Sequence, residues 1–79
     1  MRLERIQAYI RQKGWKYTYA EPEGLGALDF EVKGLRYHVW EFLDEEFGAE
    51  SNVRTASRQE DFLGDYESQI LAILESWQA

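Results

Sequence analysis

The hydrophobic pattern near the start of the chain predicts a helix. Leu3, Ile6 and Ile10 recur at intervals of three and four residues, the spacing that places side chains on one face of an α-helix. Gly14 follows, and glycine readily adopts the left-handed conformation that ends many helices. We therefore predict a helix over residues 2–13.

The central part of the chain alternates between apolar and polar residues, which is the two-residue period of a β-strand. This alternation predicts strands over residues 15–20, 27–33 and 35–43. Residues 21–26 contain the only proline and two glycines, so we expect a loop between the first two strands.

A two-residue turn at Lys33-Gly34 would fix the register of the second and third strands. In such a hairpin Val32 faces Leu35. The other facing pairs are then Phe30–Tyr37 and Leu28–Val39 on the same side, and Glu31–Arg36 and Asp29–His38 on the reverse side. A slip of one residue would exchange the two faces, so the pattern specifies the register strongly.

The region after the third strand is harder to interpret. Residues 44–57 show no periodicity, and we predict an irregular segment there. Ser57 and Glu60 fit a capping box, which predicts a helix or broken helix over residues 58–77, with Asp65 as a second candidate cap. The apolar stripe of its last part is Tyr66, Ile70, Ile73 and Trp77.

These elements predict one domain over residues 1–79 of the α+β class. The expected fold is an α-β-β-β-α two-layer sandwich, with a three-stranded antiparallel sheet and two helices on one face. Arg-Gln-Lys-Gly-Trp-Lys-Tyr leads into the first strand, and Phe-Glu-Val-Lys-Gly-Leu-Arg-Tyr forms the central hairpin. In the order of its elements and in these segments, the chain resembles the double-stranded RNA-binding domain.

That resemblance implies the fold but not the activity. The family holds phosphates with lysines at the start of its second helix. This chain has Glu60, Asp61, Asp65 and Glu67 in that region, and these would repel an RNA backbone. In general character the chain also resembles short bacterial proteins found in phages and mobile elements.

Charge is divided unequally along the 79 residues, whose formal net charge is −6. Residues 1–40 carry a net charge of +2 and residues 41–79 a net charge of −8. This balance argues against RNA or DNA as a direct partner and favours a basic protein, although an acidic surface also simply keeps a protein in solution. Without cysteine, an apolar leader or a membrane span, we expect a cytoplasmic protein.

The predicted reverse face of the sheet is the first candidate site. Trp and Tyr are frequent in interface hot spots, and exposed aromatics beside acids would bind a protein. The candidate partner-binding residues are His38, Trp40, Phe42, Asp44, Glu45 and Glu46. Alternatively, residues 44–62 fold back over the aromatics, or a second copy covers them in a homodimer.

A polar segment within the acidic half is the second candidate site. Arginine forks and the free N–H groups of a helix N-terminus together bind phosphates and carboxylates. The candidate anion-binding residues are Asn52, Arg54, Thr55, Ser57 and Arg58. In the alternative interpretation they cap the following helix and pair with nearby acids.

Catalysis finds little support in the sequence. His38 is the only histidine, and the predicted register places no second catalytic group beside it. We therefore expect no catalytic residues, no metal site and no cofactor. The leading interpretation is a small acidic interaction or inhibitor module, and binding of a nucleotide or phosphate at Arg54–Arg58 is the alternative.

Overall fold

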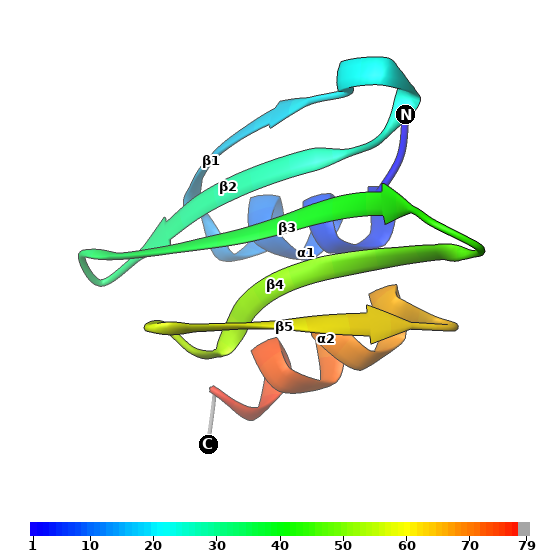
Figure 1. Ribbon diagram of the computed structural model, residues 1–79. Coiled ribbons are helices and arrows are strands. Elements are labelled where there is room, and N and C mark those ends of the chain that lie inside the picture. The colour runs from blue at the N-terminus through cyan, green and yellow to red at the C-terminus, as the bar shows by residue number, and fades with distance from the viewer. Residues whose placement is uncertain (78–79) are drawn as a thin grey trace.

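Five antiparallel strands form a single sheet, and two helices cover one of its faces (Figure 1). The structure is a computed structural model that describes residues 1–77. In chain order the elements are α1 (Glu4–Lys13), β1 (Lys16–Ala20), a short 3-10 helix (Pro22–Gly24), β2 (Ala27–Val32), β3 (Leu35–Leu43), β4 (Phe47–Thr55), β5 (Arg58–Leu63) and α2 (Tyr66–Ser76). Each strand pairs with the next one in sequence, so the sheet is a simple meander.

The first helix begins and ends close to the predicted positions. Gly14 ends α1 with a φ of 75°, and its N–H donates to the carbonyl of Arg11. The predicted apolar face is confirmed, because Ile6 and Ile10 are fully buried against the sheet. Arg11 and Lys13 lie in the last turn, where they suit the negative end of the helix dipole.

The predicted register of the β2–β3 hairpin is confirmed at every pair. Val32 faces Leu35, and Asp29 faces His38 on the other side of the sheet. Lys33 and Gly34 have φ values of 52° and 82°, so both turn residues adopt the left-handed conformation of a type I′ turn. The turn therefore matches the right-handed twist of the strands that it joins.

The predicted three-stranded sheet is wrong, because residues 47–63 add two further strands. The irregular segment predicted over 44–57 is largely β4, and the helix predicted to start at residue 58 is β5 in its first six residues. Ser57 lies in the turn between these strands and caps no helix. The element order is therefore α-β-β-β-β-β-α and differs from that of the double-stranded RNA-binding domain.

Strand β4 is stabilised by side-chain hydrogen bonds as well as by its backbone ladder. The Ser51 hydroxyl donates to the carbonyl of His38 at 2.6 Å. The Asn52 side chain accepts from the N–H of His38 and donates to the carbonyls of Arg36 and Ala56. The regular ladder between β4 and β5 is interrupted between Ser51 and Thr55, and Asn52 bonds backbone groups beside this irregularity.

The hydrophobic core lies between the helices and the inner face of the sheet. Its largest fully buried members are Ile6, Ile10, Leu28, Val39, Val53, Ile70 and Leu74. Because α1 and α2 both lie on this side, no helix within residues 1–77 covers the outer face of the sheet (Figure 1).

Candidate functional site

The outer face of the sheet carries the aromatic row that the hairpin register predicts. His38, Trp40 and Phe42 follow one another on this face of β3. The rings of His38 and Trp40 lie 4.1 Å apart between centroids, and Trp40 is 41% exposed. Residues 44–62 do not fold over this row, because they continue the sheet as β4 and β5.

The apolar row extends across the sheet from Phe42 on β3 to Leu63 on β5, because the residue between them on β4 is Gly48. A Cβ atom at Gly48 would lie 2.6 Å from Cζ of Phe42 and 2.7 Å from Cδ2 of Leu63. The two side chains therefore flank Gly48 closely, and only a residue without a side chain admits both. Leu63 remains 47% exposed.

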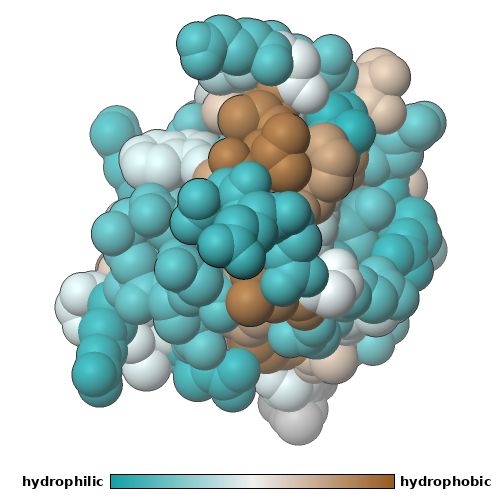
Figure 2. All heavy atoms as spheres, turned by 45° about the vertical axis from the view of Figure 1, so that its right-hand side comes forward, coloured by the Kyte–Doolittle hydropathy of each residue, from teal (hydrophilic) through white to brown (hydrophobic). Residues whose placement is uncertain are grey.

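Two more apolar side chains lie at the end of the β3–β4 hairpin. Leu43 and Phe47 face each other across the ladder, on the same side of the sheet as Glu41 and Ala49, and are 56% and 43% exposed. Figure 2 turns this end of the molecule forward and shows apolar atoms gathered between hydrophilic residues. We call the three outer-face residues Trp40, Phe42 and Leu63 the β3–β5 patch; Leu43 and Phe47 lie beside its edge on the opposite face.

Acidic residues border the β3–β5 patch. Asp44, Glu45 and Glu46 form the exposed turn at the end of the hairpin. Glu50 on β4 and Asp61 on β5 are directly opposite each other on the outer face. Like charges in such a pair destabilise the sheet, so this arrangement has a cost in the free protein. We call these five residues the acidic rim.

The imidazole of His38 lies beside the ring of Trp40, on the side away from the β3–β4 turn. Its Nε2 is 3.8 Å from a carboxylate oxygen of Glu50, which makes an ion pair when the histidine is protonated. Within residues 1–77 this buried nitrogen has no hydrogen-bond partner. The sequence placed Asp29 opposite His38, which the register confirms, but the charged neighbour of the ring is Glu50.

The candidate anion-binding segment lies in a different setting from the one expected. Its five residues are Asn52, Arg54, Thr55, Ser57 and Arg58, and they span the β4–β5 turn. Asn52 bonds the backbone around the irregularity in β4, and Nε of Arg54 donates to Glu60 at 2.7 Å. Because the expected helix start is absent here, a helix N-terminus supplies no N–H groups to this segment.

Sequence reasoning missed the most buried carboxylate. The side chain of Glu41 is 2% exposed and lies on the core side of β3. It accepts hydrogen bonds from Nε of Arg2, the hydroxyl of Tyr66 and the N–H of Gly26. Burial acts to raise the pKa of Glu41, but these hydrogen bonds outweigh it and lower that pKa below the usual value.

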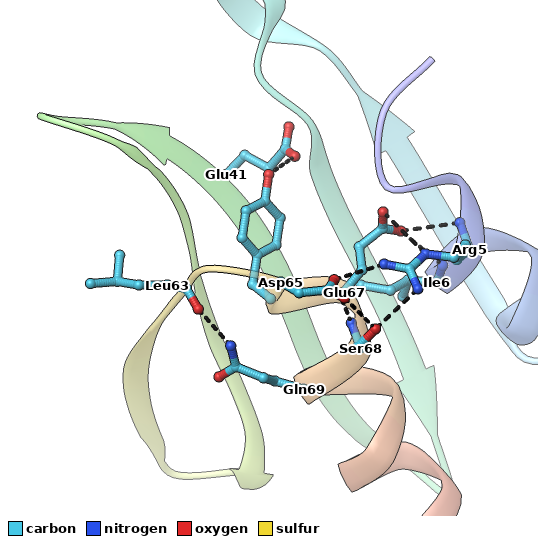
Figure 3. A network of polar contacts seen from close by, with 9 residues as sticks. Arg5, Ile6, Glu41, Leu63, Asp65, Glu67, Ser68 and Gln69 are labelled. Atoms are coloured by element: carbon cyan, nitrogen blue, oxygen red, sulfur yellow. Dashed lines mark hydrogen bonds and ion pairs between the residues drawn. The ribbon is translucent and has the colours of Figure 1, made fainter.

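A second polar network joins the two helices (Figure 3). A carboxylate oxygen of Glu67 in α2 accepts from the N–H groups of Arg5 and Ile6, which lie in the first turn of α1. The Arg5 guanidinium donates to Asp65 and Ser68. Hydrogen bonds from Ser68, and then from Arg5, lower the pKa of Asp65. Since these groups bind one another, we assign both networks to stability.

Comparisons with known proteins add nothing to this description: no family model, no curated protein and no solved structure matches the chain. Neither helix in residues 1–77 has the length and apolar character needed to cross a membrane. In the same residues, no group of three or more histidine, aspartate or glutamate side chains is placed to hold a metal ion.

Proposed function

We propose that the protein is a non-enzymatic, cytoplasmic binding module that holds a basic partner protein against the β3–β5 patch. One observation carries this proposal: Trp40 and Leu63 are exposed on a sheet face that no helix within residues 1–77 covers, and carboxylates border them. Apolar patches rimmed by polar groups are typical of protein interaction sites.

The two parts of the surface have different roles in this proposal. Trp40 and Phe42 supply the large rigid side chains that dominate the free energy of binding in many interfaces. The acidic rim attracts a partner that carries lysine or arginine, which speeds association and selects against acidic proteins. A bound cation also relieves the repulsion between Glu50 and Asp61, so binding recovers the cost of that pair.

Charge favours a basic partner over a second copy of the chain. In a two-fold symmetric dimer the same surface meets itself, so residues around the patch on one protomer lie close to the same residues on the other. The acidic rim would then oppose an identical acidic rim and repel it. A homodimer through this face is therefore the less favourable arrangement.

The test uses a defined basic probe and NMR. We expect a synthetic amphipathic peptide of lysine and leucine to shift the amide signals of β3, β4 and β5 while those of β1 stay in place. Trp40→Ser and Leu63→Ser should each weaken binding by about tenfold. Leu35→Ser is the matched control, because Leu35 is 50% exposed at the other end of β3 and should leave the affinity unchanged.

Ionic strength supplies the second readout. The association rate should fall steeply between about 50 and 300 mM salt, because screening shortens the range of the acidic rim. Equal weakening by Leu35→Ser, or signal shifts centred on β1, would show that the β3–β5 patch is not the binding surface. If the protein dimerises and Trp40→Ser abolishes the dimer, the patch binds a second copy of the chain and not a basic partner.

A further inference from the structure

A cavity lies at the end of the molecule opposite the β3–β4 turn. It has a volume of about 580 Å³, within the range of small-molecule sites. It is formed where the last turns of both helices meet the β2–β3 hairpin. The residues that line it and carry the argument are Lys13, Trp15, Lys33, Leu35, Tyr37 and Trp77.

Aromatic rings form the walls of this cavity and support one another. Trp77 lies 5.9 Å from Trp15 and 4.7 Å from Tyr37 between ring centroids. Trp15 is in turn stacked on Phe30, at 6.1 Å and with the ring planes 5° apart. Because Phe30 is 3% exposed, the aromatic wall rests directly on the core and is held in place.

Among residues 1–77, the charged side chains that line the cavity are both basic. Lys13 and Lys33 are its charged lining residues, and no acid among the described residues lines it. This is unusual for a chain with a net charge of −6. Both lysines belong to the basic half of the sequence, and the type I′ turn fixes the backbone at Lys33.

We propose that this cavity binds a small ligand with a flat aromatic ring and an attached carboxylate or phosphate. The ring would stack against Trp15, Trp77 or Tyr37, since the faces of aromatic side chains bind flat rings favourably. The anionic group would lie near Lys33. This site is independent of the β3–β5 patch, because it lies at the start of β3 and the patch lies at its end.

Tryptophan fluorescence tests the proposal directly. The chain has three tryptophans, so in a Trp40→Phe background both remaining indoles line the cavity. We expect saturable quenching by benzoate or adenosine monophosphate at about millimolar concentration or below. Benzamide and adenosine lack the negative charge and should bind at least threefold more weakly, and inorganic phosphate alone should leave the fluorescence unchanged. A preference for benzoate or for adenosine monophosphate distinguishes the carboxylate from the phosphate.

Variants locate the binding site. Lys33→Gln should weaken binding of the anionic compounds about two- to fivefold, the range for one exposed charge pair. Leu35→Asp adds an acid to the lining and should weaken it further, while the exposed position of Leu35 leaves folding intact. Lys16→Gln is the matched control, because Lys16 is an exposed lysine outside this cavity, and it should have no effect.

Three results would overturn the proposal. If the charged and neutral compounds bound with equal affinity, the charge of Lys33 would have no part in binding. If Lys16→Gln weakened binding as much as Lys33→Gln does, the effect would come from the net charge of the protein and not from a contact in the cavity. Absence of quenching by both anionic compounds, in a variant whose circular dichroism matches that of the parent, would exclude this class of ligand.

Discussion

Glu41 shows, at the scale of one residue, how a buried charge can be stabilising. Its carboxylate receives hydrogen bonds from groups in three separate parts of the chain. An isolated buried carboxylate would be strongly unfavourable, but one with a cation and two further donors is compensated. The N-terminal segment and α2 are thereby both attached to the sheet.

We expect Glu41→Gln to destabilise the protein by about 2 kcal/mol. The amide keeps the shape of the side chain but loses the charge that faces Arg2, and its NH2 group replaces the oxygen that accepts from the Tyr66 hydroxyl. The loss is below that of a fully buried pair because the Arg2 side chain is 36% exposed. Urea unfolding measures it, and Glu45→Gln in the exposed turn is the control, with a change under about 0.5 kcal/mol. Equal effects of the two variants would contradict this role for Glu41.

The sequence carries a signal for the burial of Glu41. The alternation that places Tyr37 and Val39 on the inner face places Glu41 there as well. The three donors could not be predicted, because Arg2, Gly26 and Tyr66 approach it only through the tertiary fold. The role of Asn52 was hidden for the same reason, since its bonds depend on the irregularity in β4.

At the scale of elements, the β2–β3 hairpin was predictable and the β4–β5 hairpin was not. The first has strict alternation on both strands and a turn that admits one register. In β4 the buried positions carry small or polar residues, including Ala49, Ser51 and Asn52, so the hydrophobic period is lost. In β5 most residues are polar, and Ser57 with Glu60 imitates the start of a helix. Pairing with β3, a tertiary effect, overrides these local preferences.

The hairpin turn gives a prediction about stability. Lys33 has a φ of 52°, which is unfavourable for a residue with an ordinary side chain and tolerated by asparagine. Lys33→Asn should therefore stabilise the protein by about 0.5 kcal/mol, measured as a higher urea midpoint. Lys33→Ala removes the same charge, but alanine does not favour a positive φ, so this variant should not raise the urea midpoint. A gain of equal size in both variants would assign the effect to charge.

At the scale of the whole molecule, acid sensitivity follows from the two polar networks. The folded protein lowers the pKa values of Glu41 and Asp65, so it binds these protons less readily than the unfolded chain does. The stability that they contribute is complete above the unfolded-state values, near 4, and is lost as the pH falls through the lower folded-state values. Unfolding by urea should therefore become easier below about pH 4.5.

The variants separate the two contributions to this acid sensitivity. Glu41→Gln should flatten the dependence of the urea midpoint on pH between about pH 5 and pH 3, because glutamine does not titrate. Asp65→Asn should flatten it less, since Asp65 is exposed to solvent and its interactions are screened. If Glu41→Gln leaves the dependence of the urea midpoint on pH unchanged, the acid sensitivity comes from other carboxylates.

The cap of α1 is supplied by a residue about 60 positions later in the chain, Glu67 of α2. During synthesis of the chain, the first turn of α1 therefore lacks these two hydrogen bonds until α2 has been made, and its N–H groups bind water instead. Until then Ile6 and Ile10 lack the cover that Ile70 and Leu74 help to provide. Packing of α2 against α1, and not formation of the sheet alone, completes the hydrophobic core.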